Sequence, residues 1–268
     1  MTGYIPLSVL DLVLASVFLV LNAGFSLALR LGLERQLLIA ALRMIVQLLM
    51  VGLLLKAAFA IASPWVTLGI AAVMVAFAGR EIHARQERQL RGAWGYGVGA
   101  TSMMVAGALV TIFALTSQIQ PSPWWAPQFA LPLFGMILGN TMTGVSLGLD
   151  TLHTAVSRER TAIEAQLMLG HTFRQSIAPV MRRALRSGFT PIINAMAATG
   201  VVSLPGMMTG QILSGVDPQQ AVKYQLLIMF LIGGATGLGV LGAVFASAWR
   251  LTDPRHRLRL DRLRKQEA

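Results

Sequence analysis

Long apolar runs recur along this sequence, and most of them approach the ~20 residues that an α-helix needs to cross a bilayer. Apolar residues make up 55% of the 268 residues, whereas charged residues make up only 12%, about half the share usual in soluble domains. The pattern predicts an all-α integral membrane protein with seven transmembrane helices. The predicted spans are Ile5–Leu29, Leu37–Ala62, Pro64–Gly79, Trp94–Ser117, Phe129–Leu149, Gly188–Ser203 and Tyr224–Trp249.

The connections between these runs alternate between basic and nearly uncharged. Arginines gather in the first, third and fifth connections and in the tail over residues 250–268, whereas Gln118–Gln128 carries no charge. Basic loops tend to stay on the cytoplasmic side of a membrane. Seven spans, with the N-terminus outside and the C-terminus in the cytoplasm, put every basic connection on that side. An even number of spans would divide the basic connections between the two sides.

Composition and motifs also narrow the classes of function. The net charge of +11 falls mostly in the short connections, so we expect no nucleic-acid partner. The chain has no cysteine, which excludes disulfides and thiolate chemistry. Neither a Gly-x-x-x-x-Gly-Lys-Ser/Thr phosphate loop nor a His-Glu-x-x-His motif occurs. We therefore expect no enzyme, no catalytic residue and no cofactor in this chain; any ATP is bound by a partner subunit.

The stretch Ser203–Gly215 interrupts the apolar pattern after the sixth predicted span. It carries Pro205 and Gly206, two further glycines and Gln211, which an ordinary span lacks. Helix breakers at membrane depth are tolerated only inside protein or along a water-filled cavity, and in transporters they often mark the transport path. We expect Pro205 and Gly206 to break the sixth helix on the extracytoplasmic side, where the stretch serves as an outer gate.

Polar side chains within the spans are the candidates for contact with a transported solute. Asn140, Asn194 and Gln211 are costly against lipid and are expected to face the interior, either hydrogen-bonded to another helix or lining a path. Met207 and Met208 are soft metal ligands by their chemistry, although methionine more often fills gaps in packing. All four histidines fall on the cytoplasmic side, so the metal ligands are left unassigned.

Small residues recur at helix-packing spacing in the fifth predicted span. Gly135, Gly139, Gly144 and Gly148 fall on related faces of that helix. Small residues at such spacing let helix backbones approach closely. Packing within one subunit and a seam between two subunits both fit the pattern.

The longest polar connection, over residues 151–187, has a structure of its own. Glu164–Leu169 indicates a short helix, Gly170 a turn, and the residues up to Arg174 the start of a second helix. Such a helix-turn-helix can dock into a groove on a partner. An amphipathic helix that lies along the membrane surface is the alternative, and composition allows both.

This connection resembles the coupling loop of ABC-transporter permeases. Glu164-Ala165 followed by Gly170 has the spacing Glu-Ala-Ala-x-x-x-Gly, although Gln166 replaces the second alanine and the Ile-x-Leu-Pro element is absent at its usual spacing. In that family the loop seats in a cleft of the ATP-hydrolysing subunit. The resemblance implies that Glu164, Ala165, Leu169 and Gly170 couple this chain to an ATPase.

The wider chain resembles the FetB-type permeases, which are bacterial iron-export ABC permeases with plant relatives linked to aluminium tolerance. The matching motifs are Gly135–Asn140, Val145–Leu147, Glu164-Ala165, Leu169-Gly170, Pro191–Asn194, Val202–Pro218 and Ala221–Gln225. The resemblance implies a single transmembrane permease domain over residues 1–268 in the bacterial cytoplasmic (inner) membrane. It further implies a homodimer that works with two copies of a separate cytoplasmic ATPase and exports iron or another metal ion.

An autonomous secondary transporter or channel for a small solute is the alternative function. Such a protein needs no docking loop. It usually relies on carboxylates within the membrane, and Asp11 is the one plausible candidate in this sequence.

Overall fold

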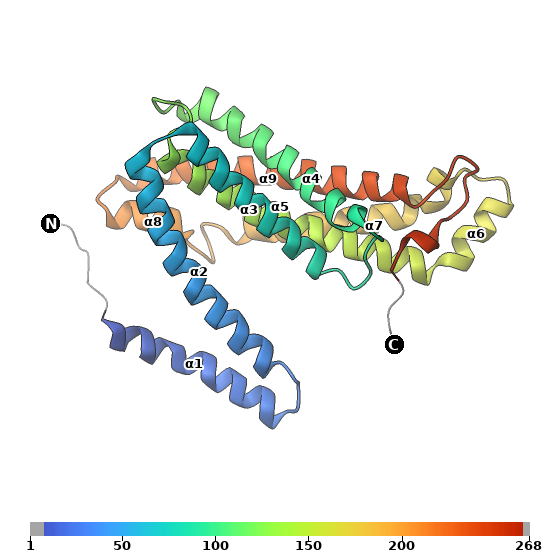
Figure 1. Ribbon diagram of the computed structural model, residues 1–268, viewed down its shortest axis with the longest axis horizontal. Coiled ribbons are helices and arrows are strands. Elements are labelled where there is room, and N and C mark those ends of the chain that lie inside the picture. The colour runs from blue at the N-terminus through green and yellow to red at the C-terminus, as the bar shows by residue number, and fades with distance from the viewer. Residues whose placement is uncertain (1–7, 265–268) are drawn as a thin grey trace.

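The computed structural model describes residues 8–264, and these residues form helices without any β-strand. The all-α prediction is therefore confirmed for this part of the chain. Figure 1 shows an elongated bundle with the short helix α6 (Arg160–Met168) at one end and the short helix α8 (Gly206–Leu213) towards the other.

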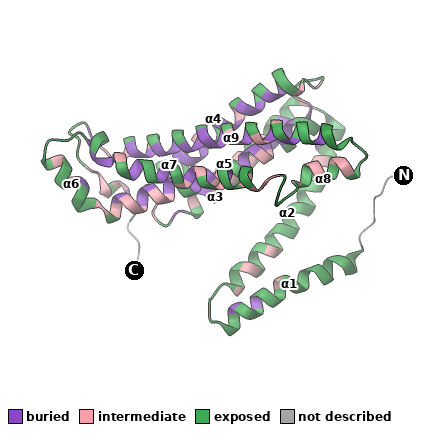
Figure 2. Ribbon diagram, turned by 180° about the vertical axis from the view of Figure 1, so that it is seen from behind, coloured by how far each residue is buried: buried purple, intermediate pink, exposed green. Residues whose placement is uncertain are grey.

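Five long helices form the packed bundle: α3 (Pro64–Ala84), α4 (Ala93–Phe113), α5 (Pro127–Arg158), α7 (Phe173–Ala198) and α9 (Pro218–Arg250). Helix α5 lies at the centre and contacts each of the other four. Its buried face carries large apolar side chains, among them Ile137, Leu149 and Leu152, which are almost fully buried. Figure 2 shows the buried residues where these helices face one another. The bundle is thus built around α5.

Close approach of α5, α7 and α9 depends on glycine. A Cβ on Gly188 of α7 would lie 2.6 Å from a methyl carbon of Val240 on α9 and 2.9 Å from the carbonyl oxygen of Gly144 on α5. A Cβ on Gly144 would lie 2.8 Å from the carbonyl oxygen of Gly188. These glycines therefore pack helices within one chain, one of the two interpretations that the sequence permits. By contrast, a Cβ on Gly139 would have nothing within 4 Å.

The first two helices, α1 (Val9–Ala28) and α2 (Glu34–Ile61), form a hairpin that leans away from the bundle (Figure 1). The hydroxyl of Ser26 fastens its turn by donating to Glu34 at 2.9 Å and accepting from the backbone N–H of Leu33 at 2.9 Å. Figure 2 shows that the hairpin is largely exposed. Because both helices are long and apolar enough to cross a membrane, this surface suits contact with lipid.

Six helical segments of the described residues are long and apolar enough to cross a membrane: α1, α2, α3, α4 with its π-helical extension η1 (Ala114–Ile119), α5 and α9. The predicted sixth span, Gly188–Ser203, is not among them. Its residues up to Ala198 form the C-terminal part of α7, and the arginines of the N-terminal part make α7 too polar as a whole. Helix α7 nevertheless runs alongside α5 and α9, from the end that holds α6 towards the end that holds α8 (Figure 1). A seventh span and the sides of the two termini stay predictions.

Asp11 lies in the first turn of α1 and caps that helix. Its carboxylate accepts hydrogen bonds from the backbone N–H and from the hydroxyl of Ser8, both at 2.8 Å. The Ser8 hydroxyl accepts in return from the backbone N–H of Asp11 at 3.3 Å. This reciprocal arrangement is a capping box, which satisfies donors that a helix N-terminus leaves open. Asp11 therefore has a structural role of its own.

Candidate functional site

Helix α6 and the beginning of α7 form a helical hairpin at one end of the bundle (Figure 1). The turn between them passes through Gly170, whose φ of +88° favours glycine. Helix α7 then begins with a capping box, in which Thr172 accepts from the N–H of Gln175 at 3.3 Å and Gln175 accepts from the N–H of Thr172 at 2.9 Å. The short helix, glycine turn and second helix are thus present, although this geometry alone assigns them no partner.

One face of α6 is packed onto the bundle. Ile163 is 2% exposed and belongs to the main apolar core, and Leu167 packs against the same core. The carboxylate of Glu159, at the break between α5 and α6, accepts hydrogen bonds from Arg183 of α7 at 2.5 and 2.6 Å. Helix α6 therefore packs on the core and is linked to α7 by this ion pair.

The opposite side of this hairpin exposes two large apolar side chains. Met168 is 82% exposed and Leu169 is 79% exposed. Glu164 pairs with an arginine one turn earlier in α6 at 2.8 Å, and the carbonyl oxygen of Ala165 accepts from the N–H of Leu169 at 3.1 Å. The predicted coupling residues Glu164, Ala165, Leu169 and Gly170 thus lie together in the segment 164–170, which we name the α6 tip.

The connection between α3 and α4 is fastened to α5 at the same end of the bundle. The carboxylate of Asp150 accepts from the backbone N–H of Glu87 at 2.7 Å. The imidazole of His153 contacts the carbonyl oxygen of Arg88 through Nδ1 at 2.9 Å and the hydroxyl of Ser247 on α9 through Nε2 at 2.6 Å. His153 is 1% exposed, and both of its ring nitrogens contact other parts of this chain, so its role here is structural. The sequence gives no signal for this role because the partners of His153 lie far away along the chain.

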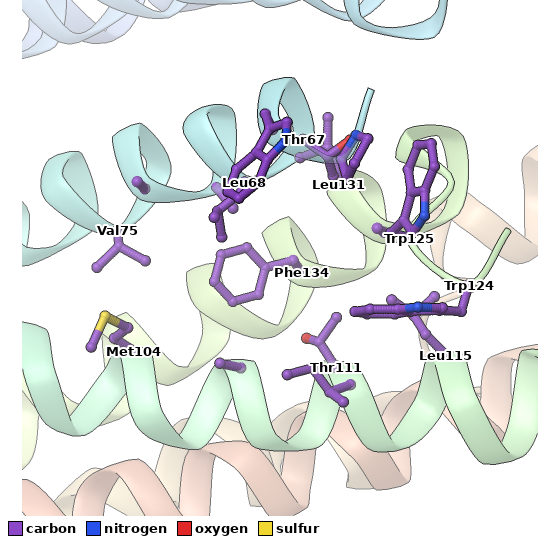
Figure 3. A pocket seen from close by; sticks show the side chains of 17 residues that line it. Thr67, Leu68, Val75, Met104, Thr111, Leu115, Trp124, Trp125, Leu131 and Phe134 are labelled. Carbon is purple, nitrogen blue, oxygen red and sulfur yellow. The ribbon is translucent and has the colours of Figure 1, made fainter. Parts of the chain in front are cut away.

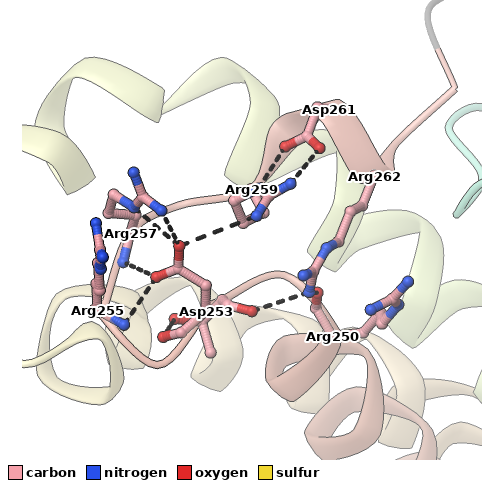
Figure 4. Close-up of polar contacts among 8 residues, drawn as sticks. Arg250, Asp253, Arg255, Arg257, Arg259, Asp261 and Arg262 are labelled. Carbon is pink, nitrogen blue, oxygen red and sulfur yellow. Dashed lines mark hydrogen bonds and ion pairs between the residues drawn. The ribbon is translucent and has the colours of Figure 1, made fainter.

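The basic tail folds back onto this end of the bundle (Figure 1), and Figure 4 shows its polar contacts. The carboxylate of Asp253 accepts from the backbone N–H groups of Arg255 and Arg257, both at 3.0 Å, and from the side chain of Arg257 at 2.8 Å. These hydrogen bonds, above all the one from the Arg257 backbone, lower the pKa of Asp253. Asp261 accepts two hydrogen bonds from Arg259, both at 2.8 Å, and they lower the pKa of Asp261 to about 2.

The end of the described tail pairs with the α3–α4 connection. The backbone N–H of Arg91 donates to the carbonyl oxygen of Arg262, and that of Arg264 donates to the carbonyl oxygen of Gln89, each at 2.8 Å. Leu263 between them is buried in the main core. The tail, the α3–α4 connection and the ends of α5 and α9 therefore form one packed, basic cap beside α6.

The break after α7 comes earlier than the sequence predicts. Helix α7 ends at Ala198, and a turn follows in which the N–H of Gly200 donates to the carbonyl oxygen of Ser203 at 2.9 Å. Pro205 is the N-cap of the separate helix α8, and Gly206 is its first residue. The expectation that these two residues break the sixth helix is therefore wrong; they begin a new one. Proline fits a helix N-terminus because it lacks only an N–H that would have no partner there.

Helix α8 carries three further candidates beside the first turns of α9. The side-chain oxygen of Gln211 is shielded from solvent and has no hydrogen-bond partner among the described residues. A buried acceptor in this state costs about 1–3 kcal/mol, so it favours a polar partner. Met207 is exposed and Met208 is half-buried, and a Cβ on Gly206 would have nothing within 4 Å. Helix α8 thus exposes Gly206 and Met207 close to the unpaired side-chain oxygen of Gln211.

Asn140 on α5 and Asn194 on α7 are exposed in the single chain, whereas interior positions were expected. Asn140 donates to a carbonyl oxygen of its own helix, that of Met136, at 2.9 Å. Asn140 precedes Gly144 by one turn, and Asn194 follows Gly188 by fewer than two turns. Because the two glycines meet where α5 and α7 cross, both amides lie at a similar depth in the bundle. Such groups are costly against lipid, so this surface favours a cover of protein or water.

No group of three or more His, Asp or Glu side chains that could hold a metal ion occurs among residues 8–264. The arginines of α7 lie in its N-terminal part, whereas Asn140, Asn194 and Gln211 are neutral amides, with methionines nearby on α8.

The fold and these surfaces define an all-helical, multi-pass membrane protein. The chain belongs to the UPF0014 family, described as an uncharacterised protein family, whose profile matches residues 9–251. No solved structure matches the chain.

Three relatives confirm the resemblance that the sequence motifs indicate. A UPF0014 membrane protein of Synechocystis is 40% identical over 223 residues, which cover 82% of this chain and 84% of the relative. The probable iron export permease protein FetB of Escherichia coli is 30% identical over 237 residues, covering 88% of this chain and 89% of the relative. Protein ALUMINUM SENSITIVE 3 of Arabidopsis thaliana is 30% identical over 224 residues, covering 83% and 80%.

Proposed function

We propose that this chain is the permease subunit of an ABC transporter that exports iron or another metal ion with energy from a separate ATPase subunit. The Escherichia coli relative is named as an iron export permease, and the alignment covers most of both chains. The chain has no phosphate-binding loop of the usual type, which favours ATP hydrolysis on another chain.

The observation that carries the proposal is the exposed α6 tip. Helix α5 is about 48 Å long at 1.5 Å per residue, against about 30 Å of bilayer hydrocarbon, which favours a position of its end and of α6 clear of the membrane. Met168 and Leu169 then face water unless another protein covers them. A helical hairpin with an apolar tip suits a groove on a partner protein. We therefore favour docking of this segment on a partner over an amphipathic helix that lies along the membrane surface.

The proposed route of coupling runs from the α6 tip through α7 to α8. The Glu159–Arg183 contact and the burial of Ile163 tie α6 to α7. Helix α7 leads directly to the turn before α8. Helix α8 in turn carries Met207, Met208 and Gln211. In this proposal α7 contains the sixth of seven spans, the N-terminus lies outside and the C-terminus lies in the cytoplasm. The basic connections gathered near α6 support that orientation.

The proposed path lies between two copies of the chain. Asn140, Asn194 and the unsatisfied oxygen of Gln211 are polar groups in membrane-crossing or adjacent helices that a single chain leaves exposed or without a partner. A second copy related by two-fold symmetry covers such a surface and encloses a polar route, the commonest arrangement of homo-oligomers. Pro205 and Gly206 start α8 at the outer end of that route, where the helix acts as a gate.

The substrate part of the proposal is iron or another metal ion in passage, not a resident metal. Neutral oxygen groups and the thioethers of Met207 and Met208 bind a cation weakly enough to release it, whereas a carboxylate cluster would retain it. The name of the bacterial relative supports iron, and the name of the Arabidopsis thaliana relative refers to sensitivity to aluminium.

An autonomous secondary transporter is the less favoured function because of Asp11. The only carboxylate that the sequence offered for such a mechanism accepts hydrogen bonds from Ser8 in a helix cap. A structural role of this kind leaves it no evident part in carrying protons or ions across the membrane.

A single thiol at the α6 tip tests the docking proposal, because the natural chain has no cysteine. Leu169→Cys places a thiol at the tip, and Leu31→Cys places a matched thiol on another exposed leucine, in the α1–α2 connection. With candidate ABC ATPase subunits of the source organism present, a short thiol-to-amine cross-linker is expected to join an ATPase to the first variant and not to the second. Absence of a conjugate for Leu169→Cys with every candidate ATPase, or equal yields at both positions, would count against the α6 tip.

A further inference from the structure

A cavity of about 510 Å³ lies between α3 and α4, with α5 as its floor. Figure 3 shows α3 and α4 on its two sides and Phe134 of α5 between them. Its volume falls within the range of small-molecule sites in proteins. The cavity lies outside the α6 tip and shares no residue with the proposed path on α5, α7 and α8.

The lining of the cavity is almost wholly apolar. Leu68 and Val75 of α3, Met104 and Leu115 of α4 and its extension, and Leu131 of α5 contribute aliphatic and thioether surface. Trp65, Trp124 and Trp125 also line the cavity. Tryptophan favours the level of the lipid headgroups, where its ring is apolar and its N–H finds a polar partner. The cavity is therefore apolar within the membrane and has an aromatic border of the kind that occurs at the membrane surface.

Two threonines interrupt this apolar lining, and the hydroxyl of Thr67 donates to the carbonyl oxygen of Ser63 at 3.1 Å. The hydroxyl of Thr111 has no hydrogen-bond partner among the described residues, although the side chain is only 6% exposed. Threonines in helices commonly donate to the carbonyl oxygen one turn earlier, as Thr101 does here to Gly97 at 2.6 Å. Figure 3 shows the Thr111 side chain on the cavity side of α4. A buried hydroxyl in this state favours a ligand that carries a hydrogen-bonding oxygen.

The backbone next to Thr111 is also irregular. Helix α4 passes into the π-helix η1 at Ala114, and Leu115 of that π-helix lines the cavity. Short π-helical segments are rare and are found frequently at functional sites. The change of helix type and the unsatisfied hydroxyl thus mark the same wall of the cavity.

The surroundings of the cavity decide which ligand it meets. All three helices that form it are long and apolar enough to cross a membrane, and Leu68, Met104 and Ile112 at its edges are exposed. The space between α3 and α4 therefore opens towards lipid, and the apolar molecules present there are lipid acyl chains. An acyl chain restores the packing contacts that an empty space lacks. The ester carbonyl at its head end is an acceptor for the Thr111 hydroxyl.

We propose that this cavity is a binding site for one acyl chain of a bilayer phospholipid, with the Thr111 hydroxyl donating to an ester carbonyl oxygen. The site is independent of the proposed transport function. A helix from a second copy of the chain is the competing occupant.

Photochemical cross-linking in lipid nanodiscs tests the site. The wild-type chain is placed in phosphatidylcholine that contains a diazirine-labelled acyl chain, and the labelled peptides are identified by mass spectrometry. Ala108→Phe adds a ring to a residue that lines the cavity, whereas Val105→Phe adds one to an exposed position on the same helix. We expect labelling of α3 and α4 residues in the cavity, a several-fold loss in Ala108→Phe and no loss in Val105→Phe. Equal labelling in all three proteins, or peptides of a second copy joined at this cavity, would overturn the proposal.

A second variant keeps the test decisive if Ala108→Phe fails to fold. Thr111→Val removes the unpaired hydroxyl and retains the shape of the side chain. Addition of phosphatidylcholine to the detergent-purified protein is expected to raise the unfolding midpoint of the wild type more than that of Thr111→Val. The same rise in both proteins would contradict the role assigned to the hydroxyl, and neither readout depends on an ATPase.

Discussion

The imidazole Nε2 of His153 on α5 lies 2.6 Å from the hydroxyl oxygen of Ser247 on α9. Its Nδ1 lies 2.9 Å from the carbonyl oxygen of Arg88, which accepts only, so Nδ1 carries the proton. In the neutral ring Nε2 then accepts from Ser247. One buried side chain thereby joins the central helix, the last helix and the α3–α4 connection, and it holds the basic cap together beside α6.

Loss of this contact is expected to destabilise the protein. Ser247→Ala leaves the buried Nε2 of His153 without a partner, which lowers the free energy of unfolding by about 1–3 kcal/mol. His153→Leu removes the imidazole, which is the other partner of the same hydrogen bond. Because both variants break the same hydrogen bond, the double variant is expected to lose less stability than the two single losses added together. Chemical unfolding in detergent measures all four proteins, and strict additivity would contradict the contact.

The crossing of α5, α7 and α9 tolerates no side chain on Gly188. Gly188→Ala places a Cβ 2.6 Å from Val240 and 2.9 Å from the backbone oxygen of Gly144, and we expect a loss of about 1–3 kcal/mol. Gly234→Ala on α9 is the matched control, because a Cβ there has nothing within 4 Å. The unfolding midpoint of the control is expected to stay level or to rise, since alanine favours a helix over glycine. Equal midpoints for the two variants would refute the close crossing.

The charge of Asp253 is expected to stabilise the folded tail in a pH-dependent way. The pKa of Asp253 is lowered in the folded protein, so its contribution is complete above the unfolded pKa of about 4 and is lost as the pH falls through the folded value. Asp253→Asn removes that charge. The wild type should therefore have the higher unfolding midpoint by a constant difference from about pH 7 to about pH 4, and the difference should shrink at lower pH. A difference that already declines between about pH 7 and about pH 5 would contradict this assignment.

Asp11→Asn separates the two functional classes. An asparagine can still accept from the backbone N–H of Ser8, so the helix cap is largely retained. The permease account predicts unchanged metal transport for this variant in proteoliposomes that contain the ATPase. Loss of transport with normal folding would instead support a mechanism driven by an intramembrane carboxylate.

The sequence predicts the apolar helices well because their length and composition are local properties. The predicted span Trp94–Ser117 corresponds to α4 and most of η1, and Tyr224–Trp249 lies within α9. The sixth span is harder to predict. Its apolar residues share a helix with the arginines before Gly188, and the chain turns at Ala198 rather than at the proline. Proline marks either the end of one helix or the start of the next, and only the surrounding structure distinguishes them.

The α6 tip could be predicted because a glycine turn between a short helix and the start of the next helix is a local signal. The basic cap could not, since Asp253 binds backbone groups whose positions depend on the folded tail, and His153 depends on Ser247 of another helix. The cavity at Thr111 likewise depends on how three separate helices pack against one another. The exposure of Asn140 and Asn194 could not be predicted either. Both are polar residues in apolar segments, and their exposure depends on which faces of α5 and α7 other helices leave uncovered.

ATP-driven accumulation of ferrous iron in proteoliposomes tests whether this chain is a permease that an ATPase drives through the α6 tip. The chain is reconstituted with the ATPase that binds it, and ATP is added to vesicles whose ATPase faces outwards. We expect iron uptake into the lumen that requires ATP and is abolished by Leu169→Asp at the α6 tip, while Leu31→Asp in the α1–α2 connection transports normally. Uptake that proceeds without ATP, or that is the same in Leu169→Asp and in the wild type, would contradict a permease driven through the α6 tip.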